Sequence, residues 1–125
     1  MNFEWVEYLN LAHELGGQTL SPANQEARLR AAISRAYYAV FCKCCNHLRD
    51  KENHRIPSGG KAHQYVCAEF KRSMNKPRRQ IGQTLERLRS DRNKADYDDT
   101  IIMLHSLAKT DLALADSAIS ILNKL

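Results

Sequence analysis

The chain has 125 residues, of which 43% are hydrophobic and 26% charged, and its formal net charge at pH 7 is +5. This length allows one domain with a substantial core that needs no disulfide or metal. No stretch approaches the roughly 18 apolar residues of a membrane span, and the acidic N-terminus does not resemble a signal peptide. We therefore expect a single domain over residues 1–125, in a cytoplasmic protein without a membrane partner.

Apolar residues recur at helical spacing along most of the chain, and no segment shows the alternation of a strand. The first predicted helix covers residues 3–15 and ends at a pair of glycines. Ser21 and Pro22 form a helix-start signal, because a capping hydroxyl precedes a proline that suits the first helical position. They predict a long helix over 22–51, which would form the spine of the domain.

Three further helices are predicted after a loop over 52–61 that is rich in glycine and proline. A helix over 62–74 ends before Pro77, and helices over 78–95 and 101–123 follow. The apolar stripe on the first of these consists of His63, Val66, Cys67, Phe70 and Met74. The residues expected to cap the last helix are Asp98, Asp99 or Thr100.

Antiparallel helices with short connections and one apolar face each predict an all-α, up-and-down bundle. We expect four main helices, with the short N-terminal helix packing across them. The last helix has more apolar surface than a four-helix core needs, so a homodimer is a natural way to bury the excess.

The four cysteines are Cys42, Cys44, Cys45 and Cys67. Nearby histidines suggest zinc, but three of these cysteines lie within one helical pattern rather than on a turn facing a second element. Free thiols are therefore favoured over a zinc site. We predict no metal and no cofactor.

Positive charge is concentrated in one segment, because residues 71–94 contain nine basic and two acidic side chains. Such a concentration is typical of a protein that binds a phosphate-bearing partner. A solvated helix face with a basic loop would show the same pattern. Charge alone does not decide between these two interpretations.

In the segment "RSDRNKADYDD", residues 89–99, an apolar stripe of helical spacing is followed by charged residues on the same face. The stripe continues from Leu88 to Arg92, and Asp96 lies one turn later on the same face. The two residues form either a structural ion pair or a functional site. His63 begins its helix beside a flexible loop, where a titratable group can reach a cleft.

Two motifs about fifty residues apart, "AISRAYYAVFCKCCNHL" and "LERLRSDRNKADYDD", resemble those of short stand-alone HEPN domains. The resemblance extends from about Arg28 to the C-terminus. It implies a helical bundle that dimerises. Many members of this family are metal-independent endoribonucleases of toxin–antitoxin or phage-defence systems, often encoded beside a small nucleotidyltransferase antitoxin. The resemblance therefore implies such an activity and such a partner for this chain.

The resemblance assigns the motif arginine to Arg92 and its polar neighbour to Asn93. The motif histidine should fall at 97–99, which are Tyr97, Asp98 and Asp99, so this chain departs from the pattern. Metal-free RNA cleavage uses the 2′-hydroxyl as nucleophile, with a proton-transfer group and a cation near the phosphate. Arg92 would be the cation. Tyr97 is a poor base but could be an acid or a phosphate ligand, and Asp96 would be a base only with a raised pKa, which Arg92 opposes. His63 or a group of the partner chain could also replace the histidine.

Three hypotheses follow. The first is a homodimeric HEPN ribonuclease that targets RNA, with catalytic residues Arg92, Asn93, Asp96, Tyr97 and His63, and with RNA or phosphate bound by Arg35, Tyr38, Arg78, Arg79 and Arg89. The second is a non-catalytic HEPN module that binds nucleotide or RNA, or partners a nucleotidyltransferase. The third is a plain helical scaffold with a buried Arg92–Asp96 pair.

Overall fold

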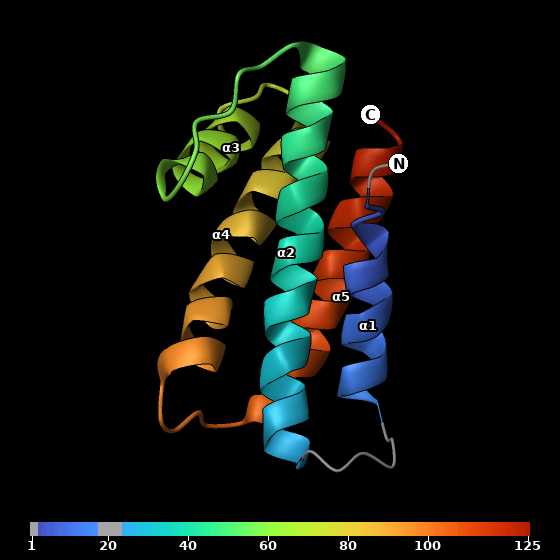
Figure 1. Cartoon of the computed structure of the whole chain (residues 1–125). Coiled ribbons are helices and arrows are strands. Elements are labelled where there is room, and N and C mark those ends of the chain that lie inside the picture. The colour runs from blue at the N-terminus through green and yellow to red at the C-terminus, as the bar shows by residue number, and fades with distance from the viewer. Residues whose placement is uncertain (1–2, 18–23) are drawn as a thin grey trace.

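A computed structural model of the protein describes residues 3–17 and 24–125, which form five α-helices and, within those ranges, no strand (Figure 1). None of the helices in these ranges is both long and apolar enough to cross a membrane. The helices are α1 (Val6–Gly16), α2 (Gln25–Glu52), α3 (Lys61–Lys71), α4 (Lys76–Tyr97) and α5 (Leu104–Asn123).

The predicted all-helical antiparallel bundle is confirmed. The helices α1 and α4 run antiparallel to α2 and α5, and α2 contacts each of the other four helices (Figure 1). The arrangement differs in one respect from the expectation. The N-terminal helix α1 lies alongside α2 and α5, whereas α3 is the helix outside the four and contacts only α2 and α4.

The core is one continuous cluster to which all five helices contribute, with a second, smaller cluster where α2, α4 and the start of α5 meet. Burying each large aliphatic or aromatic side chain contributes about 1.5–3 kcal/mol to folding. The helical spacing of apolar residues that predicts a long helix over 22–51 corresponds to a buried face of α2, whose members include Leu29, Ile33, Tyr37, Val40, Cys44 and Leu48.

Two asparagines cap helix N-termini and satisfy backbone N–H groups that have no partner within the helix. The Oδ1 atom of Asn24 accepts from the Ala27 N–H at 2.8 Å at the start of α2. Ser21 and Pro22, the predicted start signal, lie outside the described residues. At the start of α4, Asn75 accepts from the Arg78 N–H at 3.0 Å, and a proline occupies the first turn.

Replacing Asn75 with alanine is expected to lower the free energy of unfolding by about 1 kcal/mol, because the Arg78 N–H loses its acceptor. Urea denaturation measures this change. Asn75→Asp keeps an acceptor oxygen and serves as the control. Equal stability of the alanine variant and the wild type would show that the cap contributes nothing.

Two predicted boundaries are wrong. The helix α3 ends at Lys71, so Met74 lies beyond it and is 94% exposed instead of buried. The helix α5 begins at Leu104, and its N-cap residue is Met103 in the left-handed region (φ 58°), with no side-chain cap from residues 98–100. The reason is that Arg30 of α2 binds carbonyl oxygens of this connection, which delays the start of α5.

The interface between α4 and α5 buries two carboxyl groups. Asp111 is 0% exposed and Asp91 is 2% exposed, and the Nε atom of Arg87 donates to Asp91 at 2.8 Å. Neither oxygen of an ionised Asp111 has a hydrogen-bond partner. Burial and the adjacent Asp91 carboxyl raise the pKa of Asp111 to about 8. A proton on Asp111 therefore supplies the donor that this pair needs.

All four cysteines are free thiols. Burial raises the pKa of Cys42 to about 11 and that of Cys45 to about 12, so these thiols are protonated and unreactive near neutral pH. No group of three or more His, Cys, Asp or Glu residues suited to a metal ion occurs in the described ranges.

Candidate functional site

Six of the predicted site residues come together where α2 and α4 pack. We call this group the Arg92 cluster, and its members are Arg35, Tyr38, Arg92, Asn93, Asp96 and Tyr97. The Nη2 atom of Arg92 donates to the Tyr38 hydroxyl at 2.8 Å, and Nη1 donates to Oδ1 of Asn93 at 3.0 Å. Its Nε atom lies 2.9 Å from Oδ2 of Asp96, one helical turn away.

Stacked rings and guanidinium groups order the cluster further. Arg35 lies over the ring of Tyr8 at 4.7 Å and over that of Tyr38 at 5.0 Å. Arg92 lies over the same Tyr38 ring at 5.2 Å and over Tyr97 at 5.8 Å. Two cations therefore share one aromatic ring, an arrangement stabilised by the negative faces of the rings. The contribution of Tyr8 from α1 was not predicted, because an aromatic residue at helical spacing indicates only core packing.

An arginine outside the predicted site holds the end of α4 in place. Arg30 of α2 donates to the carbonyl oxygens of Ala95 at 3.1 Å, Asp98 at 2.5 Å and Asp99 at 3.1 Å. Ala95 is in the last turn of α4, where a helix leaves carbonyl oxygens without partners, and Asp98 and Asp99 directly follow the helix. The backbone that carries Asp96 and Tyr97 is therefore fixed against α2.

The cluster is accessible to solvent. The side chain of Arg92 is 19% exposed and that of Asp96 is 29% exposed, and Tyr97 is 73% exposed. The scaffold hypothesis requires a buried Arg92–Asp96 pair, whereas the observed pair faces water on one side. Two guanidinium groups and one carboxylate leave the cluster with an excess positive charge, which can attract an anion.

His63 lies apart from the Arg92 cluster, at the start of α3. Its Nδ1 atom is 2.9 Å from the Tyr37 hydroxyl, and its ring stacks on Phe41 at a centroid distance of 6.0 Å. Burial and the nearby Arg89 lower the pKa of His63 to about 4, so the imidazole is neutral at pH 7. Burial also raises the pKa of Tyr37 far above its ordinary value, which keeps the phenol protonated.

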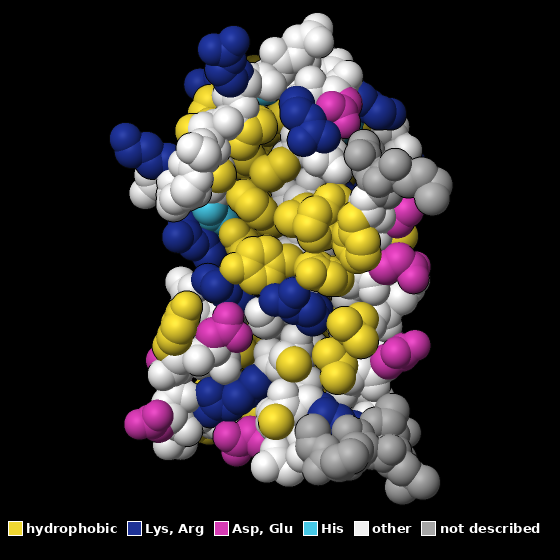
Figure 2. All heavy atoms as spheres, in the orientation of Figure 1, with side chains coloured by type: hydrophobic (Ala, Val, Ile, Leu, Met, Phe, Trp, Pro, Cys, Tyr) yellow, Lys and Arg dark blue, Asp and Glu magenta, His cyan; other side chains and the backbone are white. Residues whose placement is uncertain are grey.

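A groove of about 760 Å³ runs between α3 and α4. His63 and Arg89 line it, and Asn93 lines it as well as accepting from Arg92. Asn93 thus connects the groove to the Arg92 cluster. Figure 2 shows apolar side chains gathered at the middle of this face of the molecule, with basic side chains beside and below them.

Two predicted phosphate ligands lie elsewhere. Arg78 donates to Glu52 at 2.5 Å and 3.3 Å, and Arg79 donates to the carbonyl oxygens of Ser73 and Met74. Arg78 is roughly 20 Å from Arg92 along α4, at 1.5 Å per residue. The structure does not bring these two arginines to the Arg92 cluster.

Within the described part of the chain, ion pairs hold five of the nine basic side chains of the segment 71–94. Lys71 pairs with Glu86 at 2.7 Å, and Arg72 pairs with Glu69. Arg89 makes no ion pair with any residue that the structure describes, and it lines the groove between α3 and α4. The free positive charge of the segment is therefore more local than the sequence suggests.

The chain matches no known protein-family profile, and no match was found among solved structures. It is similar to an uncharacterized protein of Methanocaldococcus jannaschii, with 30% identity over 110 residues. The match covers 77% of this chain and 61% of that protein. The chain thus spans about three fifths of the length of the relative it matches.

Proposed function

We propose that this protein is an RNA-targeting protein of HEPN type and acts as a metal-independent endoribonuclease of a toxin–antitoxin or phage-defence system. The observation that carries the proposal is the solvent-accessible guanidinium of Arg92, preorganised by Tyr38 and Asp96 and adjacent to Asn93. A guanidinium held in a fixed position can donate to both non-bridging oxygens of a phosphodiester. The sequence resemblance to HEPN domains supplies the reaction class.

In this mechanism the 2′-hydroxyl of the substrate attacks the neighbouring phosphate, and the 5′-oxygen of the next nucleotide leaves. Arg92 and Arg35 stabilise the negative charge that develops on the phosphate. Tyr97 lies exposed beside Arg92 and donates a proton to the leaving oxygen. Neutral His63 lies in the groove that Asn93 joins to the Arg92 cluster, and it accepts the 2′-hydroxyl proton through Nε2 when its Nδ1–H is directed at Tyr37.

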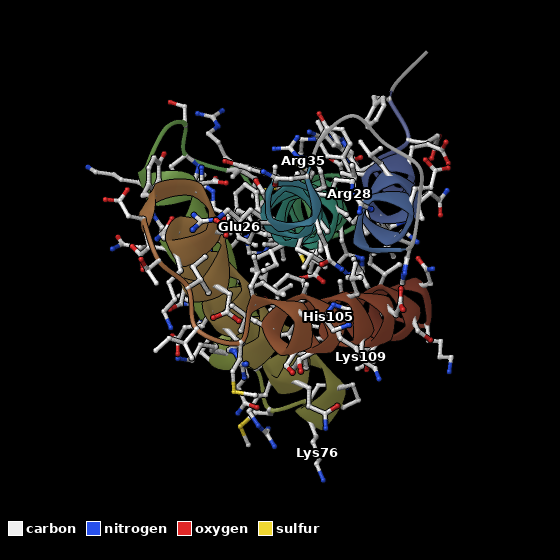
Figure 3. All side chains as sticks on the ribbon, turned by 90° about the horizontal axis from the view of Figure 1, so that it is seen from below. Glu26, Arg28, Arg35, Lys76, His105 and Lys109 are labelled. Atoms are coloured by element: carbon white, nitrogen blue, oxygen red, sulfur yellow. The ribbon has the colours of Figure 1, made fainter. Side chains whose placement is uncertain are left out.

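Arg92→Ala tests the proposal. Total RNA is incubated with the purified protein in excess chelator, and the variant is expected to lose activity by roughly 100-fold or more, as expected for loss of a group that stabilises transition-state charge. Lys109→Ala is the control, because Lys109 is exposed on α5, on the opposite side of the bundle from Arg35 (Figure 3). Full activity in a folded Arg92→Ala variant would contradict the site.

A second candidate function is a non-catalytic HEPN module that binds RNA or nucleotide, or that partners a nucleotidyltransferase. It is favoured by the absence of a histidine at positions 97–99 and by the hydrogen bond that engages His63 with Tyr37. The same assay separates the two functions. RNA binding that depends on Arg92, without cleavage, supports the module.

The proposal includes a homodimer and an antitoxin of nucleotidyltransferase type, in the cytoplasm. What supports a protein partner is the half-exposed aromatic surface beside the Arg92 cluster. Phe3, Trp5 and Tyr8 contact one another at 4.8–5.3 Å, and aromatic side chains of this kind are enriched at interfaces. Sedimentation equilibrium of the pure protein measures its own association.

A further inference from the structure

We infer that the groove between α3 and α4 is a nucleotide subsite, which holds one unpaired nucleotide of an RNA whose adjoining phosphate lies at Arg92. This inference rests on the proposed function and adds the location and chemistry of a base pocket. It concerns a cavity separate from the Arg92 cluster and joined to it through Asn93.

The shape of the groove follows from one close helix contact. A Cβ atom on Gly82 would lie 2.7 Å from the backbone nitrogen of Lys71, so α3 and α4 approach there as closely as only glycine permits. The thiol of Cys67 donates to the Gly82 carbonyl oxygen at 3.3 Å at the same place. The contact lies beside the groove, because Cys67 and Lys71 also line it, and the groove volume of about 760 Å³ is typical of small-ligand pockets.

The lining suits a flat heterocycle with a polar edge. Cys67 and Ala68 supply an apolar wall, whereas Gln64, Ser90 and Asn93 supply neutral amide and hydroxyl groups. Amides offer a donor and an acceptor side by side, which is how proteins read the edges of bases. An aliphatic ligand would leave these polar groups without partners, and that is costly.

The charges of the groove indicate a single phosphate. Lys71 is neutralised by Glu86, and Arg72 is held by Glu69. Arg89 lines the groove without an ion pair among the described residues, so one cation is left for one phosphodiester. His63 is uncharged near neutral pH and adds no second positive charge.

The connection to Arg92 favours RNA over a free small molecule. Asn93 lies in the groove and accepts from Arg92 through Oδ1. A nucleotide whose base lies along the groove therefore has its chain directed toward the Arg92 cluster. Unpaired nucleotides are the form in which RNA bases become available to such pockets.

Titration of the full chain with the four ribonucleoside monophosphates, by calorimetry, tests the subsite. Ala68→Trp fills the groove. It is expected to weaken monophosphate binding by about tenfold or more, because the ligand loses its apolar contact and its hydrogen bonds. Ala113→Trp is the matched control, because Ala113 is exposed on α5, which does not contact α3. Circular dichroism checks that both variants fold.

Arg89→Gln tests the phosphate assignment separately. It is expected to weaken monophosphate binding by about tenfold, as expected for a charge-assisted hydrogen bond, and to leave binding of the corresponding nucleoside unchanged. Lys109→Gln removes one charge outside the groove and controls for net charge. The inference is overturned if no monophosphate binds, or if Ala68→Trp and Arg89→Gln bind as the wild type does.

Failure of the nucleotide subsite can be distinguished from failure of the proposed function. If RNA is cleaved in an Arg92-dependent way but Ala68→Trp leaves KM unchanged, the subsite is wrong and the function stands. If monophosphates bind in the groove but RNA is neither bound nor cleaved, the subsite stands and the proposed function is wrong.

Discussion

Raising the pH from 6.5 to 8 is expected to lower the free energy of unfolding, by up to about 1.4 kcal/mol per pH unit. The cause is Asp111, whose carboxyl has a pKa of about 8 in the folded protein and an ordinary value of 3.8. Between these values the folded chain keeps a proton that the unfolded chain releases. Stability from this group therefore falls as the pH rises, and the loss is complete above about pH 8.

The window from 6.5 to 8 isolates Asp111 from the oppositely directed effect of His63. The pKa of His63 is lowered from 6.5 to about 4 by burial, so its contribution rises with pH up to about 6.5 and is constant beyond. The groups that face Asp111 are Asp91, Arg87 and Lys94, all from α4. Below pH 6.5 the two effects partly cancel.

Asp111→Asn removes the titration and keeps a donor for Asp91, because an amide has nearly the shape of the protonated carboxyl. We expect its urea denaturation midpoint to be constant between pH 6.5 and 8 and to exceed that of the wild type at pH 8.5. Asp99→Asn, at an exposed position, should follow the wild-type curve. A wild-type midpoint that does not fall over this interval would show that Asp111 does not keep its proton in the folded protein.

Gly82→Ala is expected to lower the free energy of unfolding by about 1–3 kcal/mol, the usual cost of forcing an extra methyl into a packed interface. The new Cβ would lie 2.7 Å from the nitrogen and 3.0 Å from the Cα atom of Lys71. Because these are backbone atoms, a side-chain rotation cannot relieve the clash, and α3 must move away from α4. The same displacement should weaken ligand binding in the groove.

Gly60→Ala provides the comparison, because a Cβ there meets nothing within 4 Å and the backbone is in the right-handed helical region. Its stability should stay within about 0.5 kcal/mol of the wild type, as for most surface substitutions. Thermal or urea unfolding of both variants measures the difference. Equal stabilities of the two would mean that α3 and α4 are not in close contact at Gly82.

The fold was predictable because each helix has a periodic apolar stripe and a recognisable end. The stripe of α2 and the break before Pro77 both correspond to observed elements. One of the two boundaries that failed, the start of α5, depended on a tertiary contact. The start of α5 is delayed by hydrogen bonds from Arg30 to carbonyl oxygens of a distant segment, which no local pattern encodes.

The candidate site was predictable in part. Arg92 and Asp96 were recognised because charge interrupts an apolar stripe, and the structure joins them to Tyr38. Arg78 could not be judged from charge counts, since its partner Glu52 is on another helix. The buried carboxyl of Asp111 was not predicted, although it also interrupts an apolar stripe. By the reasoning applied to Arg92 and Asp96, such an interruption indicates either a structural group or a functional site.

The placement of α3 outside the four-helix bundle has a consequence for motion. Since α3 lies outside the four-helix bundle and contacts only α2 and α4, it can detach without separating the helices of the bundle from one another. Local openings with the smallest free-energy cost are sampled most often, and their backbone amides exchange soonest with deuterated solvent. Opening of α3 therefore widens the groove between α3 and α4, so a ligand can enter without disturbing the bundle.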